Sequence, residues 1–190
     1  MKKLFKGAFF LLLALLFSSA SSFAYTKTSA SPTTTMEKPV MKTEKNDYQL
    51  AYPGMLPDNP LYKIKVLRDK IMEKLIIDPQ KKIDYYLLQT DKQIAMVAML
   101  VDKKASALAK ETALKGENNF TELVFMYKKT STKPDAKTLK KLQKAAGKHQ
   151  EILMNSIKKV NAEDAKVLQQ VINFSKTNVT ELEKLFKGIQ

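Results

Sequence analysis

The chain has 190 residues, of which 44% are hydrophobic and 27% are charged, so it is long and apolar enough to contain one folded domain. It has 33 Lys and Arg against 19 Asp and Glu, which gives a formal net charge of +14. It has no Cys and a single His, which excludes a disulfide framework, a thiolate zinc site and a Cys nucleophile.

The N-terminus, residues 1–24, has the layout of a secretory signal peptide. Three lysines form a basic start, residues 8–17 are an uninterrupted apolar run, and small residues lead to Ala24. A membrane-spanning helix needs about 20 apolar residues, which is more than this run provides. We therefore expect cleavage near Ala24 and a secreted or periplasmic protein. If the segment is not cleaved, it is the chain's link to the membrane.

Residues 25–51 are predicted to be a disordered linker. They are rich in Thr, Ser, Lys and Pro, and their isolated apolar residues show no period. Such a segment buries too little surface to offset the entropy lost on ordering. Residues 52–190 are expected to form a helical domain, which begins with three prolines and a glycine between Tyr52 and Pro60.

The first predicted helix runs from Pro60 to about Ile77, with Asp58 or Asn59 as its cap. Apolar residues recur along it every three or four positions and form a stripe. The stripe consists of Leu61, Ile64, Leu67, Ile71 and Leu75.

A second helix is predicted to begin directly afterwards, because Asp78-Pro79 again combines a cap with a proline. No proline or glycine follows until Gly116, so we expect one long helix over about 79–115, about 55 Å in length. Gly116 is interpreted as its C-terminal stop. A helix this long needs neighbours or a second chain to cover it, so its apolar side is a candidate interaction face. That face consists of Tyr86, Ile94, Met96, Val97, Leu100 and Val101.

Three further helices are predicted within residues 118–190. Asn118 is a candidate cap for the first, Asp135 for the second, and Asn161 with Asp164 forms a capping box for the third. No segment alternates as a strand would. We therefore predict an all-α fold, a helical bundle or helical-hairpin array of about five helices, in which residues 52–115 are a helical hairpin and 118–190 are the C-terminal helices.

No residue pattern indicates catalysis, a cofactor or a metal. His149 lies on an apolar helix face without a second His or Cys, so it is interpreted as a packing residue. Met96 and Met99 have a spacing that could bind Cu(I), but methionine commonly fills gaps in helical cores. The glycines are single, and no acid lies inside an apolar run. We expect no enzyme, no catalytic residue, no cofactor and no metal site.

The positive charge favours an anionic partner. It is carried by lysine, with Arg68 as the single arginine, whereas proteins that read nucleic-acid bases favour arginine. We therefore expect no nucleic acid, and an anionic envelope polymer or a protein partner or client instead. A homodimer through the long helix is also compatible with the sequence.

The entrance to the helical domain carries a recognisable motif, Leu56-Pro57-x-x-Pro60-Leu61-Tyr62. A basic amphipathic helix, Asp78-Pro79 and a long second helix follow it. On these features residues 53–115 resemble a bacterial extracytoplasmic domain of unknown function, which implies an envelope context and no catalytic residues. A second resemblance, in composition alone, is to Spy-type periplasmic chaperones, although their Leu-Thr-x-x-Gln motifs are absent.

Three functions follow from these features. The first is a non-enzymatic module that binds a macromolecule or has a structural role in the envelope. The second is a Spy-like holdase, which would combine basic attraction with apolar contacts. The third is a binder of an anionic envelope polymer or membrane surface through a lysine-rich face.

Overall fold

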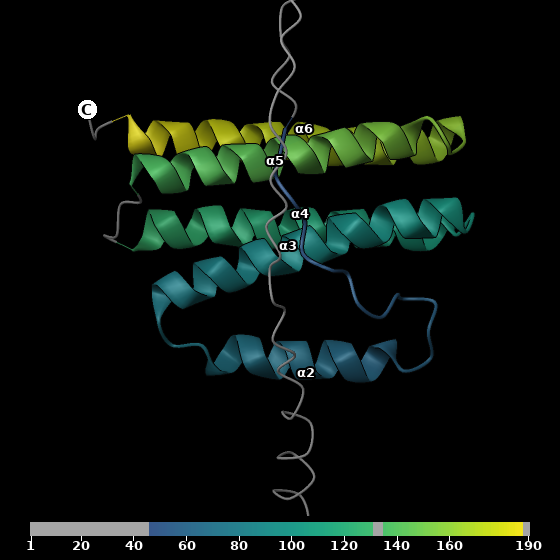
Figure 1. Ribbon diagram of the computed structural model, residues 1–190, viewed down its shortest axis with the longest axis horizontal. Helices are drawn as coiled ribbons and strands as arrows, with labels where there is room; N and C mark the ends of the chain where they lie inside the picture. The colour runs from purple at the N-terminus through teal and green to yellow at the C-terminus, as the bar shows by residue number, and fades with distance from the viewer. Residues whose placement is uncertain (1–45, 131–134, 188–190) are drawn as a thin grey trace, which may run out of the picture. The chain divides into compact units, whose positions relative to one another are not determined.

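The computed structural model describes residues 46–130 and 135–187, and within these ranges it contains helices and no strand. The all-α prediction is confirmed. The expected signal peptide and residues 25–45 of the expected linker lie outside the described residues. Figure 1 shows the helices in chain order: α2 (Tyr62–Leu75), α3 (Pro79–Asp102), α4 (Ser106–Lys129), α5 (Ala136–Ile157) and α6 (Ala162–Phe186).

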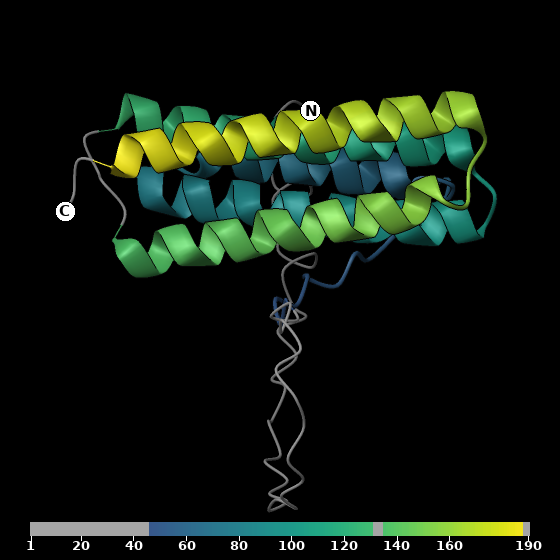
Figure 2. The ribbon, with the colours of Figure 1, turned by 90° about the horizontal axis from the view of Figure 1, so that it is seen from above.

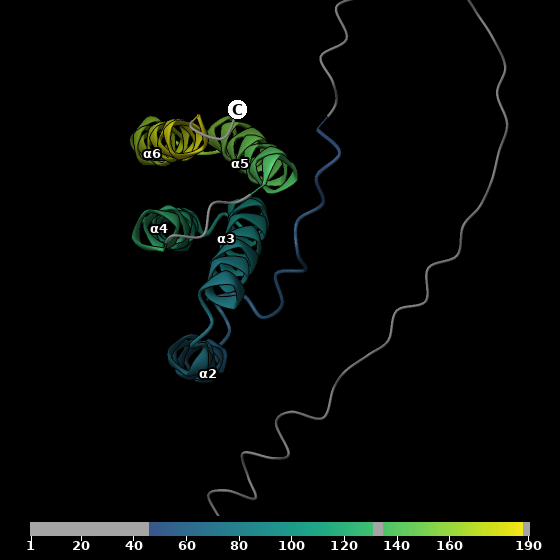
Figure 3. The same ribbon diagram turned by 90° about the vertical axis from the view of Figure 1, so that its left-hand side faces the viewer.

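Helices α3 to α6 form a four-helix bundle made of two antiparallel pairs, α3 with α4 and α5 with α6. Each packs against two others: α3 against α4 and α5, and α6 against α4 and α5. Figure 2 shows α5 and α6 side by side, and the end-on view in Figure 3 shows the four helices at the corners of the bundle. Short connections join consecutive helices, but α4 and α5 lie at diagonal corners of the bundle and do not pack against each other as the two antiparallel pairs do.

The bundle core consists of two apolar clusters with polar side chains between them. One cluster joins the C-terminal half of α3 to the N-terminal half of α4, and the other joins the opposite halves of these helices. The polar side chains lie near the middle of each helix and are buried in the described structure. They include Thr90, Asp91, Glu117, His149 and Ser175.

The prediction of one helix over 79–115 is wrong, because α3 ends at Asp102. Lys104 has a left-handed backbone with φ of 58°. Its N–H donates to the Val101 carbonyl at 2.9 Å, and the Ala105 N–H donates to the Leu100 carbonyl at 2.8 Å. These two bonds are the Schellman arrangement that closes many helices, usually with glycine at the left-handed position. Because this position holds lysine and not glycine, the sequence does not indicate that the helix ends here.

Gly116 lies inside α4 and does not end a helix. A Cβ atom at this position would be 3.1 Å from Cβ of Gln93 and 3.2 Å from Cδ1 of Ile94. The missing side chain therefore lets α3 and α4 approach closely. Asn118 follows within the same helix, so the expected cap and helix start at Asn118 are also wrong.

The other predicted helix starts are confirmed. Asp78, Asp135 and Asn161 each accept a hydrogen bond on the side chain from the backbone N–H three residues further on. These bonds satisfy donors that the first turn of a helix leaves free. The helix predicted from Pro60 with Asp58 or Asn59 as its cap begins at Tyr62 instead. Its cap residue is Leu61, which makes no side-chain capping bond, although Asn59 accepts the Leu61 N–H at 2.9 Å.

Residues 46–51, which we call the strap, contain no helix but contact the bundle. The Asn46 side-chain amide donates to the Lys144 carbonyl on α5 at 2.7 Å. Leu50 packs against one of the apolar clusters. The strap falls in the range predicted as a disordered linker, and the structure places it on the bundle instead, because these contacts hold it there.

Candidate interaction surface

Helix α2 lies outside the bundle, next to α3 and away from α5 and α6 (Figures 1 and 3). Its backbone makes almost no close approach to the other described helices. The side chains that point toward α3 and α4 recur every three or four residues and form what we call the inner stripe. The inner stripe consists of Tyr62, Val66, Asp69 and Glu73.

The inner stripe holds α2 mainly through one aromatic side chain and two hydrogen bonds. Tyr62 is buried in an apolar cluster of the bundle. The Tyr85 hydroxyl donates to the Asp69 carbonyl at 2.7 Å, and the Tyr86 hydroxyl donates to Oε1 of Glu73 at 2.9 Å. Turning the other side of α2 toward α3 would take these acceptors away from the two phenols.

The opposite side of α2 carries the apolar stripe predicted from the sequence, here called the outer stripe, and all of it is exposed. A surface helix normally turns such a stripe toward the core. Here the exposed fractions run from 45% for Ile71 to 66% for Leu75. The outer stripe consists of Leu61, Ile64, Leu67, Ile71 and Leu75. α2 is therefore an amphipathic helix whose apolar side faces outward.

The exposed face of α2 is also positively charged. Both acids of α2, Asp69 and Glu73, belong to the inner stripe, and Asp69 forms an ion pair with Arg68 at 2.7 Å. Lys65 is half-buried over the Tyr62 ring, and burial lowers its pKa. The remaining cations of α2 are exposed beside the outer stripe. They are Lys63, Arg68, Lys70 and Lys74.

A cavity of about 480 Å³ separates α2 from α3 and α4. Its lining combines apolar surface, from residues such as Val66 and Leu114, with the polar side chains of Asp69, Glu73, Gln89, Gln93 and Glu111. If the outer stripe were turned toward this space, these polar side chains would be buried against apolar groups, which is unfavourable. The cavity explains why α2 makes few close contacts with the bundle.

The residues predicted as an interaction face of the long helix lie in the core of the chain. The exposed fraction of each is 5% or less, because α4, α5 and α6 cover the inward side of α3. In this structure they form no surface that a partner could reach. The residues concerned are Tyr86, Ile94, Met96, Val97, Leu100 and Val101.

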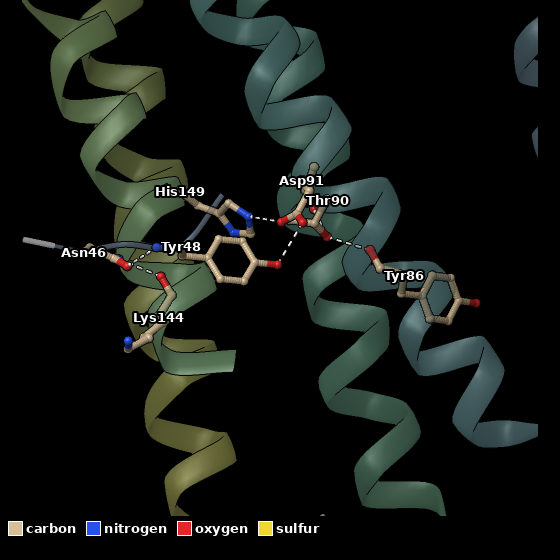
Figure 4. A network of polar contacts seen from close by, with 8 residues as sticks. Asn46, Tyr48, Tyr86, Thr90, Asp91, Lys144 and His149 are labelled. Atoms are coloured by element: carbon tan, nitrogen blue, oxygen red, sulfur yellow. Dashed lines mark hydrogen bonds and ion pairs between the residues drawn. The ribbon is translucent and has the colours of Figure 1, made fainter. Parts of the chain in front are cut away.

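A buried polar network joins the strap, α3 and α5 (Figure 4). Asp91 accepts the Tyr48 hydroxyl at 2.8 Å on one oxygen, and its other oxygen lies 2.7 Å from Nε2 of His149. Burial raises the pKa of Tyr48, and the Asp91 carboxylate acts in the same direction. Because His149 is 2% exposed and Asp91 5% exposed, the pair has no access to a substrate, and its effect is to hold three segments together.

Sequence reasoning missed the partner of His149 because that partner comes from another helix. No carboxylate lies beside His149 on its own helix face, and Asp91 is followed by Lys92, which resembles a solvated position. Only the packing of α3 on α5 brings the two side chains together. His149 is buried as expected of a packing residue, and it also contacts the Phe120 ring edge-to-face.

Glu117 is a second buried acid in the bundle. Burial raises its pKa to about 7, while a hydrogen bond from the Asn178 side chain at 2.7 Å acts in the opposite direction. Asn178 also donates to the Thr121 hydroxyl at 2.8 Å, which ties α6 to α4. These contacts belong to the packing between helices.

A second basic surface lies along α5 near the strap. A cavity of about 550 Å³ there is lined by Asp47, Tyr48 and Gln49 of the strap and by four lysines. One of them, Lys144, forms an ion pair with Asp47 at 2.6 Å. The other three, Lys137, Lys140 and Lys141, are exposed. This surface has charge but no apolar stripe.

The described residues were searched for metal-ligand clusters and for helices that could span a membrane. Within residues 46–130 and 135–187, no three His, Cys, Asp or Glu side chains come together as a metal site would require. Met96 is fully buried, whereas Met99 is 42% exposed, so these methionines lie in different surroundings. None of the helices in these ranges is both long and apolar enough to span a bilayer.

Comparison with known proteins places the chain in a family. Residues 54–181 match the domain of unknown function DUF5667, and the chain belongs to this family. The match extends beyond the 53–115 range of the resemblance seen in the sequence, because it includes α4, α5 and most of α6. No curated protein and no solved structure matched the chain, so nothing in these comparisons supports the likeness to Spy-type chaperones.

Proposed function

We propose that this chain is a non-enzymatic, extracytoplasmic module that binds another macromolecule of the cell envelope through the outer face of α2. The observation that supports the proposal is the outer stripe, five exposed apolar side chains along one helix with cations beside them. Contiguous exposed apolar surface on a folded protein commonly marks a binding site.

The bundle itself offers no comparable surface in its described part. Its large exposed apolar side chains are single residues such as Phe125, Met154 and Phe174, which lie on different helices. Isolated residues of this kind are normal on protein surfaces. The continuous stripe on α2 is therefore the better candidate for recognition.

The non-enzymatic role is supported by the burial and the hydrogen bonds of three titratable side chains. Asp91, His149 and Glu117 are all buried and bonded to neighbouring side chains. The extracytoplasmic location rests on the N-terminal sequence, where a basic start, an apolar run and small residues follow one another.

Cosedimentation of the chain from Tyr25 to Gln190 with cell envelopes tests the proposal. This chain keeps every described residue, and circular dichroism checks that it is folded. Leu67→Asp combined with Ile71→Asp should weaken binding by about tenfold or more, because two apolar contacts are replaced by charges. Phe174→Asp, an equally exposed apolar position on α6, is the matched control and should bind like the unchanged chain.

Equal binding by the outer-stripe variant and the unchanged chain would contradict the proposal. A set of lysine substitutions on α5, Lys137→Gln, Lys140→Gln and Lys141→Gln, tests the alternative of an anionic polymer held by the second basic surface. If that set abolishes envelope binding and the outer-stripe variant does not, the alternative is correct.

A further inference from the structure

We infer that the partner of α2 is an anionic lipid bilayer, on which the helix lies in the plane of the headgroups. The inference rests on the binding surface of the proposed function, the outer face of α2, and assigns a lipid surface of the envelope, in place of a macromolecule, as what it binds. It is carried by three observations: a single apolar stripe, cations on both sides of the stripe, and the position of α2 at the edge of the molecule.

The apolar stripe has the form of an interfacial helix. α2 has 14 residues and is about 21 Å long, and its apolar side chains occupy one side. A helix that is apolar on one side and polar on the other lies at the boundary between headgroups and acyl chains. Ile77, two residues after the end of the helix and 92% exposed, adds apolar surface near its C-terminal end.

The charges of α2 are arranged for an anionic surface. Lys63, Lys70 and Lys74 are exposed on one side of the outer stripe, where Lys70 also borders the cavity. Arg68, paired with Asp69, lies on the other side, while both acids of α2 face the bundle. Lysine stems can pack along the apolar layer while their ammonium groups reach the headgroups. Each such lysine is expected to raise the affinity for an anionic bilayer by about fivefold.

The position of α2 lets a flat surface reach it. α2 runs roughly along the bundle and lies at its outer edge in both side and end views (Figures 1 and 3). The bundle lies behind the inner stripe, so it does not cover Ile64, Leu67 or Ile71. A bilayer can therefore contact the stripe along its length.

A second copy of the chain fits the same face less well. Two α2 helices packed through their outer stripes would bring their cations together with no acid of either α2 between them. Like charges across an interface oppose association, whereas anionic lipid headgroups neutralise them. An acidic protein partner is the remaining occupant, and the experiment below distinguishes it from lipid.

Tryptophan fluorescence gives a direct test, because the sequence contains no Trp. Leu67→Trp places one indole in the middle of the outer stripe, and Phe174→Trp places one at a similarly exposed position on α6. The chain from Tyr25 to Gln190 is mixed with phosphatidylcholine vesicles, with or without about one-third phosphatidylglycerol. We expect a blue shift for Leu67→Trp on the anionic vesicles, and none for Phe174→Trp.

Charge variants sharpen the test. Substituting Gln for Lys63, Lys70 and Lys74 together should weaken binding to the anionic vesicles by about fivefold for each lysine. Substituting Gln for Lys137, Lys140 and Lys141 changes the net charge by the same amount on α5 and should have little effect. Added salt should lower the affinity of the unchanged chain.

The outcomes separate the lipid inference from the proposed function. If anionic vesicles cause no blue shift while envelope binding still depends on Leu67 and Ile71, the lipid inference is wrong and the proposed function stands. An equal shift on neutral vesicles, or an equal loss from the α5 lysine set, would overturn the inference as well. If light scattering shows a dimer that Leu67→Asp separates, the occupant is a second copy. If neither vesicles nor envelopes depend on the outer stripe, both proposals fail.

Discussion

Helices α2 and α5 are both amphipathic, yet they use their apolar sides in opposite ways. Leu142, Ala146 and Leu153 of α5 are turned inward and are almost completely buried, whereas Ile64 and Leu67 of α2 are about 60% exposed. α5 lies between α3 and α6, which cover its apolar side. α2 has a cavity on its inner side and carries its apolar stripe on the outer side, which is left for solvent or a partner.

This difference shows that apolar periodicity locates a stripe but does not say what covers it. In the bundle, four helices cover one another, and the hydrophobic effect stabilises the chain itself. In α2, Tyr62 is the only buried side chain of the helix, so the same kind of surface adds little to folding. The buried side chains that stabilise the chain and the outer stripe proposed for recognition therefore lie on different helices, and this difference can be tested residue by residue.

The largest expected effect is on the bundle core. Phe120→Ala should lower the free energy of unfolding by about 3–5 kcal/mol, because Phe120 is fully buried and its removal leaves a cavity. Leu67→Ala, also an apolar truncation but on the exposed stripe, should change it by no more than about 0.5 kcal/mol. Chemical denaturation measures both. A similar loss for the two variants would mean that the outer stripe belongs to the core.

The next effect concerns Glu117, whose pKa is raised to about 7 by burial. Between about pH 4.5 and 7 the folded state keeps a proton that the unfolded chain has lost, so stability falls as pH rises across this window. Glu117→Gln keeps an acceptor for Asn178 and should remove this decrease of stability with pH, because glutamine does not titrate. Above pH 7 the variant should be more stable by about 1–3 kcal/mol, and below pH 4.5 it should match the unchanged chain. Denaturation curves at pH 4 and pH 8 that show no such difference would contradict the burial of a charged Glu117.

A smaller and local effect is expected where α2 is attached. Tyr85→Phe and Tyr86→Phe remove the hydroxyls that donate to Asp69 and Glu73, and each should weaken the attachment by about 0.5–1.5 kcal/mol. Amide hydrogen exchange should become faster in α2 and stay unchanged in α5 and α6. Tyr62→Phe is the control, because Tyr62 is buried in the apolar cluster. Faster exchange throughout the bundle would show that α2 folds as one unit with it.

The smallest effect is at the turn between α3 and α4. Lys104 has a positive φ, which glycine adopts without a steric penalty. Lys104→Gly should therefore raise the free energy of unfolding by at most about 1 kcal/mol. Lys103→Gly is the matched control and should be destabilising, because Lys103 has φ of −78°. A loss of stability in Lys104→Gly would contradict the left-handed turn.

The helix starts could be predicted because each depends on residues next to one another. The side chains of Asp78, Asp135 and Asn161 cap the first turns of their own helices, and the structure confirms all three. The end of α3 could not be predicted, because lysine at a left-handed position gives no signal. Gly116 gave an ambiguous signal, since glycine serves both at helix ends and where two helices approach closely.

The candidate site was visible in part. The outer stripe of α2 could be read from its spacing, and its cations from the same segment. That the outer stripe faces away from the bundle could not be predicted. This orientation depends on Tyr85 and Tyr86 of α3, which bind the inner stripe. The pairing of Asp91 with His149 has the same origin: it joins residues 58 positions apart through the packing of two helices.

The strap determines how mechanical load enters the folded domain. Its polar contacts are the Asn46 hydrogen bond and the Asp47 ion pair to Lys144 of α5 and the Tyr48 hydrogen bond to Asp91 of α3, and no strand ladder shares their load. A pull applied upstream of Asn46 therefore loads the Asn46 bond before the Tyr48 bond. These bonds would break one after the other, starting from the N-terminal end of the strap, before the force reaches α2. If the N-terminus is held at a surface, tension would detach the strap first and leave the bundle folded.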